Sequence, residues 1–184
     1  MKKAVRILTI LLPVSGCLTI AAGIMLFFLP SGTPAVFDAT KGYGPFDMRL
    51  NYTADAFMTI LSPIEGDRIK LYTDYFILDY ILTVCFALTA VSLPVFIYIQ
   101  DDTHYLLFRS TLFSAVAMTF FNVLENILIM NIVNNTPIFT DGEANFSSGI
   151  TTLKWAFIAL WSVSAILLSA VTITDKIVSL RSKK

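Results

Sequence analysis

Two carboxylic acids interrupt long apolar stretches of this 184-residue chain. Asp79 stands at the start of a segment that is uncharged from Tyr80 to Gln100, and Glu125 is the single acid between residues 105 and 133. A charged carboxylate at the centre of a membrane helix costs on the order of 3 kcal/mol. Each acid therefore needs either a satisfying partner or a function, such as binding a cation or hydroxyl group or transferring a proton.

Helical spacing places further polar residues beside these acids. Arg68, Tyr72, Tyr75 and Asp79 recur along one stripe of a helix. Asn122 precedes Glu125 by three residues and Asn126 follows it. Lys154 begins the next apolar stretch on the same predicted side of the membrane, where its long side chain can reach a carboxylate. The predicted ligand-binding residues are Asp79, Asn122, Glu125, Asn126, Lys154, Tyr75, Tyr72 and Arg68.

Two interpretations of this cluster stay open. Asn and Glu side chains can hydrogen-bond across helices and only fix their packing. The same groups can instead line a polar pocket inside the membrane, open toward the outside, that binds a small molecule or lipid. Whether such a pocket would also catalyse a reaction is undecided, and the sequence identifies no catalytic residue.

The elements that must position these residues are four predicted transmembrane helices. Apolar stretches long enough to cross a bilayer cover residues 7–29, 72–99, 105–133 and 151–174. The chain is 56% hydrophobic and only 14% charged, which is too little charge for a soluble domain. We therefore expect an all-α fold, a four-transmembrane-helix bundle that forms a single membrane domain over residues 1–184.

Charge distribution predicts the orientation of this bundle. Lys and Arg residues precede the first span and follow the last, and the connection 134–150 has none. By the positive-inside rule both termini are cytoplasmic, and residues 175–184 form a cytoplasmic tail. The Met-Lys-Lys start favours a bacterial inner membrane. Residues 14–17 also resemble a bacterial lipobox, so processing at Cys17 is an alternative to an intact first span.

The predicted extracytoplasmic loop, residues 30–71, is too long for a simple connector. Its first half is rich in Gly and Pro and is predicted to be irregular. Residues 53–61 predict a short helix whose apolar face holds Phe57, Ile60 and Leu61. A capping box from Ser62 to Glu65, with Pro63 at the first helical position, predicts that the second long helix begins at Pro63.

Composition excludes several other classes of protein. One histidine and two cysteines are too few for a His/Cys metal site, and no nucleotide-binding or hydrolase motif occurs. Lys and Arg balance Asp and Glu at 13 each, and no basic stripe predicts nucleic-acid binding. We expect no metal and no cofactor. The predicted partners are the lipid bilayer and a lipid or small-molecule ligand, while a protein partner or a second copy of the chain stays open.

Parts of the chain resemble a loosely defined group of uncharacterised bacterial four-helix membrane proteins. The resemblance rests on Phe37-Asp38, Gly42-Tyr43, Tyr52-Thr53-Ala54, Gly66-Asp67-Arg68, Tyr72, Leu78-Asp79 and the run from Asn122 to Asn126. That group is expected to carry Asp-x-x-Glu-Asn in the third span, where this chain has Asn122 at the first position. The architecture with two buried carboxylates also resembles the sigma-2 receptor and emopamil-binding superfamily, which implies binding of sterol-like or cationic amphiphiles.

Overall fold

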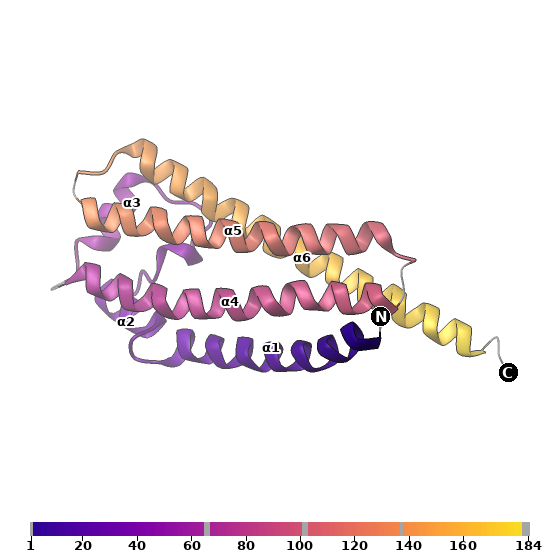
Figure 1. Cartoon of the computed structure of the whole chain (residues 1–184). Coiled ribbons are helices and arrows are strands. Elements are labelled where there is room, and N and C mark those ends of the chain that lie inside the picture. Colours follow the sequence, from indigo (N-terminus) through magenta and orange to yellow (C-terminus); the bar gives the residue numbers. More distant parts are fainter. Residues whose placement is uncertain (1, 65–66, 101–102, 137, 182–184) are drawn as a thin grey trace.

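Four long helices form the body of the protein. The computed structural model describes residues 2–64, 67–100, 103–136 and 138–181, and no strand occurs among them. The long helices are α1 (Lys2–Phe28), α4 (Arg68–Gln100), α5 (Tyr105–Asn135) and α6 (Asp141–Arg181), shown in Figure 1. All four are long and apolar enough to cross a membrane. The all-α class is thereby confirmed, and the four predicted spans are confirmed as regards length and composition.

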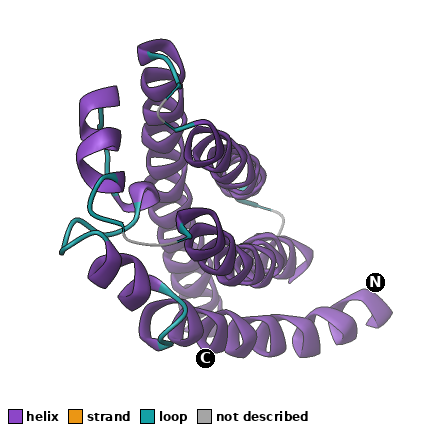
Figure 2. Cartoon of the chain, turned by 90° about the vertical axis from the view of Figure 1, so that its left-hand side faces the viewer, coloured by secondary structure: helices purple, strands orange, loops and turns teal. Residues whose placement is uncertain are grey.

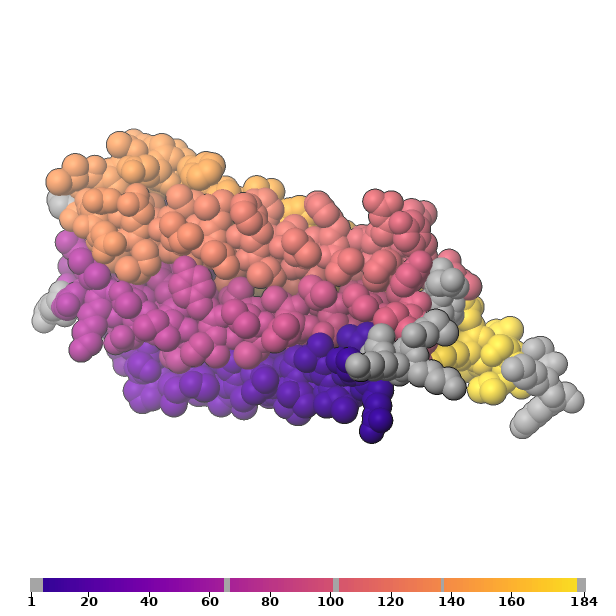
Figure 3. Space-filling model, in the orientation of Figure 1, coloured from indigo at the N-terminus to yellow at the C-terminus, as the bar shows by residue number. Residues whose placement is uncertain are grey.

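The long helices pack in the order α1, α4, α5, α6. Extensive contacts join α1 to α4, α4 to α5, and α5 to α6, and α6 meets α4 less extensively. Figure 3 shows α1, α4 and α5 side by side on one face. Helix α6 crosses the others at an angle, so that its two ends meet different neighbours (Figure 1). The connection between α1 and α4 and the start of α6 lie at the same end of the bundle, which we call the loop end.

Three short helices lie in the connection at the loop end. They are α2 (Thr33–Ala39), the 3-10 helix η1 (Phe46–Met48) and α3 (Ala54–Leu61). Figure 2 looks onto this end and shows the connection gathered to one side of the long helices. The predicted short helix is confirmed as α3, with Thr53 as its N-cap and with Phe57, Ile60 and Leu61 buried. The first half is more ordered than predicted, because Pro34 fits the first turn of α2, where a backbone N–H has no helical partner.

The prediction that the second long helix begins at Pro63 is wrong. Helix α4 begins at Arg68, and the backbone N–H of Ser62 instead donates to the Met58 carbonyl at the end of α3. The Asp67 carboxylate accepts a hydrogen bond of 3.0 Å from the backbone N–H of Lys70 and thereby caps α4. Glu65, the other half of the predicted capping box, lies outside the described residues.

Helix α6 begins ten residues earlier than the predicted span at 151. The Thr140 hydroxyl accepts from the Glu143 backbone N–H at 3.2 Å, and the Glu143 carboxylate accepts from the Thr140 backbone N–H at 2.7 Å. This reciprocal pair is a capping box. At the other end α6 continues to Arg181, through most of the segment predicted as a cytoplasmic tail.

Aromatic packing fixes η1 inside the loop end. Phe46 is fully buried, with its ring centroid 3.9 Å from that of Phe57 and 5.8 Å from that of Tyr72. The preceding turn depends on Gly44, whose φ of +75° is unfavourable for other residues and whose missing Cβ would lie 2.6 Å from the Phe37 ring. Because Phe46 is held in this way, its neighbour Asp47 is directed into the bundle.

Candidate functional site

A cavity of about 280 Å³ lies inside the loop half of the bundle. All four long helices and η1 contribute to its wall. The polar side chains of the lining are Asp47, Tyr75, Asp79, Thr83, Thr119, Asn122 and Lys154. Apolar side chains form the rest of the lining, among them Leu82, Phe86, Met118 and Ile158. The cavity thus has the apolar wall and the few convergent polar groups that are typical of small-molecule sites.

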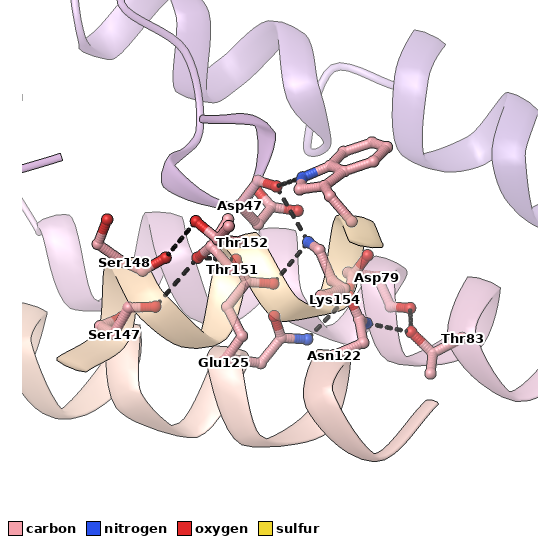
Figure 4. A network of polar contacts seen from close by, with 12 residues as sticks. Asp47, Asp79, Thr83, Asn122, Glu125, Ser147, Ser148, Thr151, Thr152 and Lys154 are labelled. Atoms are coloured by element: carbon pink, nitrogen blue, oxygen red, sulfur yellow. Dashed lines mark hydrogen bonds and ion pairs between the residues drawn. The ribbon is translucent and has the colours of Figure 1, made fainter. Parts of the chain in front are cut away.

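Two amides of α5 hold the Asp79 carboxylate from α4. The Nδ2 atoms of Asn122 and Asn126 donate to Asp79 Oδ2 at 2.8 Å and 2.6 Å. The Asn122 amide also lies 2.5 Å from the Thr83 hydroxyl oxygen (Figure 4). Asp79 is only 6% exposed, and no described residue donates to its other oxygen, Oδ1. The carboxylate therefore lines the cavity with one oxygen fixed by two amides and the other without a donor among the described residues.

An ion pair lies beside this clamp, between α5 and α6. Lys154 Nζ is 2.5 Å from Glu125 Oε2, and both side chains are almost fully buried. The Lys154 ammonium also donates to the backbone carbonyl of Asp47 at 3.0 Å, so that it joins η1 to both helices (Figure 4). Glu125 lies behind the cavity wall and does not line it.

Asp47 lines the cavity but was not among the site residues predicted from the sequence. Its carboxylate oxygens each accept from the Tyr75 hydroxyl at 2.9 Å, and its backbone carbonyl accepts from Trp155 Nε1 at 3.1 Å as well as from Lys154. Burial raises the pKa of Asp47 from 3.8 to about 6, although the nearby Lys154 charge acts in the opposite direction. Asp47 therefore brings a second, weakly acidic carboxyl group to the cavity.

Hydroxyl groups extend the ion pair toward the loop end. The Thr151 hydroxyl donates to Glu125 Oε1 and lies 3.0 Å from the Tyr52 hydroxyl, which is 2.9 Å from Ser147 Oγ. Burial raises the pKa of Tyr52 to about 12, so Tyr52 remains a neutral hydroxyl. Glu125 Oε1 thus meets the Thr151 hydroxyl and Oε2 meets the Lys154 ammonium, so that the buried carboxylate has a partner at each oxygen.

The structure brings most of the predicted site residues together. Asp79, Asn122 and Asn126 form one group, Glu125 and Lys154 form the adjoining group, and Tyr75 is connected to Lys154 through Asp47. Two predicted site residues lie elsewhere.

Tyr72 and Arg68 do not line the cavity, and their predicted part in ligand binding stays a prediction. Tyr72 packs among the aromatic rings of the loop end instead. Arg68 lies at the first turn of α4 and donates to the Thr136 carbonyl, beyond the end of α5. Both residues lie on the same stripe of α4 as Asp79, but about two and three turns closer to the loop end.

The two acids Glu125 and Asp79 differ in whether a cation is paired with them. Two ion pairs occur among the described residues, Lys154 with Glu125 and His104 with Asp175. Asp79 therefore has no cationic partner in the described part of the chain. A buried carboxylate without a cation favours a ligand that carries a positive charge or a hydrogen-bond donor. No group of three or more His, Cys, Asp or Glu side chains is placed to hold a metal ion within the described ranges.

Comparisons with protein-family models, curated proteins and solved structures find no match to this chain.

The first prediction concerns the buried ion pair. Lys154→Met should lower the free energy of unfolding by on the order of 3 kcal/mol, because Glu125 keeps a buried charge without its partner. The double variant Lys154→Met/Glu125→Gln should recover most of this loss. Thermal unfolding in detergent measures both effects, and losses that simply add in the double variant would contradict the pairing.

The second prediction concerns the pH dependence contributed by Asp47. Since its pKa is about 6 in the folded protein, Asp47 holds a proton that the unfolded chain has already released above about pH 4. Its contribution to stability is therefore largest at low pH and falls as pH rises through about 6. Asp47→Asn mimics the protonated form, so its stability relative to wild type should improve over this range by at most about 3 kcal/mol.

Asp55→Asn is the matched control, because Asp55 is exposed on α3. Denaturation of the two variants and the wild-type protein between pH 4 and 8 is the measurement. A stability difference between Asp47→Asn and wild type that does not change with pH would contradict the raised pKa.

Proposed function

We propose that this chain is a multi-pass membrane protein that binds a small molecule or lipid in the cavity beside Asp79. The observation that supports this most is the environment of the Asp79 carboxylate. It is buried and lines a cavity, two amides fix one of its oxygens, and no described cation neutralises it. A ligand ammonium or hydroxyl group that meets Oδ1 would supply the missing donor.

The shape of the cavity supports the same proposal. An apolar wall lies next to the polar end, so a ligand with one polar group and an apolar body would satisfy both. Because the Lys154 ammonium already binds Glu125 and the Asp47 carbonyl, it does not compete for Asp79. In the proposed orientation the loop end faces away from the cytoplasm, in agreement with the basic residues at both termini.

A structural or assembly role is the second candidate function. The group formed by Lys154, Glu125 and Thr151 supports it, because these polar atoms are paired with one another and lock α5, α6 and η1 together. In this alternative the cavity is incidental and the connection at the loop end binds another protein. The two candidates differ in what Asp79 does, since only ligand binding requires its free oxygen.

Asp79→Asn separates the two candidates. The substitution keeps the size of the side chain but removes its charge, so we expect the ligand-free variant to be at least as stable as wild type. Dodecylammonium is a suitable probe, with dodecanol as its uncharged counterpart. At a probe concentration 100 times its Kd the wild-type protein should gain about 2.7 kcal/mol, and Asp79→Asn should lose this gain for dodecylammonium.

Asp74→Asn provides the control for the same measurement. Asp74 lies on the same helix but does not line the cavity. Its variant should respond to both probes as the wild type does. Equal stabilisation of Asp79→Asn and wild type by dodecylammonium would refute ligand binding at Asp79 and favour the structural candidate.

A further inference from the structure

The cavity is closed toward the loop end and exposed at its side. Above its polar end, Phe46 is fully buried and Asp47 is 5% exposed, so η1 covers the cavity. Three other lining residues are much more exposed: Phe27 at 44%, Trp155 at 38% and Met48 at 36%. They come from α1, α6 and η1, and they mark a rim on the flank of the bundle. We call these three residues the rim.

The order of helix packing explains why the flank is open there. Helices α1 and α6 are the two ends of the packing row, and no extensive contact joins them in the described part of the chain. Between them the cavity is backed by α4 and α5. Helix η1 is joined to α6 at the loop end, where Lys154 and Trp155 both donate to the Asp47 carbonyl. A molecule reaching the cavity would therefore have to pass beside η1, between α1 and α6.

The position of the rim along the helices indicates what surrounds it. Phe27 is the penultimate residue of α1, and Trp155 begins the part of α6 that is uncharged as far as Thr174. Both residues thus lie near one boundary of the apolar spans, where tryptophan is enriched in membrane proteins. The rim opens toward the polar–apolar boundary of a bilayer and not toward bulk water.

The cavity also has a polar and an apolar end along the membrane normal. From Tyr75 to Phe86 its wall spans twelve residues of α4, or about 16 Å of helix. Asp47, Tyr75 and Asp79 lie at the end near the boundary, and Phe86 and Ile158 lie toward the middle of the spans. This polarity matches the way in which an amphiphile is oriented in one leaflet.

We infer that the ligand is a single-chain amphiphile of the loop-side leaflet, and that it enters sideways between α1 and α6 past the rim. Its ammonium or hydroxyl group meets Asp79, and its apolar chain lies against Phe86 and Ile158. This inference rests on the proposed ligand binding at Asp79 and adds to it the class of ligand and the route of entry. Because the ligand never leaves the membrane, its polar group moves only from the headgroup region to the carboxylate.

The two tryptophans of the chain provide the test. The Trp161 ring centroid is 5.2 Å from that of Phe86, at the apolar end of the cavity, whereas Trp155 belongs to the rim. In a Trp155→Phe background Trp161 is the only tryptophan. The probe is 12-bromododecylammonium, whose terminal bromine quenches tryptophan fluorescence at close range. In liposomes we expect quenching of Trp161 that Asp79→Asn abolishes.

Rim variants then test the route. Phe27→Ala widens the rim, so it should accelerate both binding and release of the probe several-fold in stopped-flow measurements. Met48→Ala is the second rim variant, should Phe27→Ala fail to fold. Leu50→Ala is the control, because Leu50 follows η1, is 62% exposed and does not line the cavity. It should leave both rates as they are.

The outcomes of these measurements separate the route of entry from ligand binding itself. Quenching that depends on Asp79, with rates that the rim variants leave unchanged, overturns lateral entry but keeps the proposed function. Faster binding in Leu50→Ala than in the rim variants places the entry at the loop end instead. Quenching that is absent, or that persists in Asp79→Asn, overturns the proposed function and this inference with it.

Discussion

A buried ammonium group joins three separate parts of the chain at Lys154. Its Nζ atom is 2.5 Å from the Glu125 carboxylate of α5 and 3.0 Å from the backbone carbonyl of Asp47 in η1. Such a charge is tolerated away from water only when it is paired and hydrogen-bonded, and here both conditions are met. Removing either partner leaves a buried charge without compensation. The position of η1, and with it the roof of the cavity, depends on this group.

The same interaction determines the charge that the cavity presents. Because Lys154 neutralises Glu125, it leaves Asp79 as a carboxylate without a cation. The contacts therefore favour different roles for the two buried acids. Glu125 has all its oxygens occupied by Lys154 and Thr151 and fixes helix packing. Asp79 has an oxygen that no described residue uses, next to an apolar cavity, which suits ligand binding. We thus propose the two interpretations of the polar cluster for neighbouring halves of it.

The sequence was sufficient to predict the four long helices, though not all of their ends, and to predict which polar side chains meet between them. Asp79, Asn122 and Asn126 were predicted to meet because a helix places residues three and four apart on one face. Lys154 was predicted to turn inward because its stem is long enough to reach a carboxylate. Tyr72 and Arg68 share the stripe of Asp79, but a stripe does not specify how far along the helix the cavity extends.

The features that were missed depend on contacts between distant parts of the chain. Asp47 lies in the connection between α1 and α4, and its inward position follows from the packing of Phe46 against Phe57 and Tyr72. No local pattern encodes such packing. The early start of α6 did have a local signal, the Thr140–Glu143 capping box, and the spacing of Ser147, Thr151 and Lys154 along α6 was a second one. Both signals were overlooked because the helix was predicted from hydropathy, which places a helix end where the apolar residues end.

Ligand binding at Asp79 is the central claim, and native mass spectrometry of the protein purified from its membrane tests it most directly. The wild-type protein should retain an amphiphile that carries an amine or hydroxyl group, and Asp79→Asn should lose it while Asp74→Asn keeps it. A wild-type protein without a bound amphiphile, or equal occupancy in wild type and Asp79→Asn, would contradict the claim.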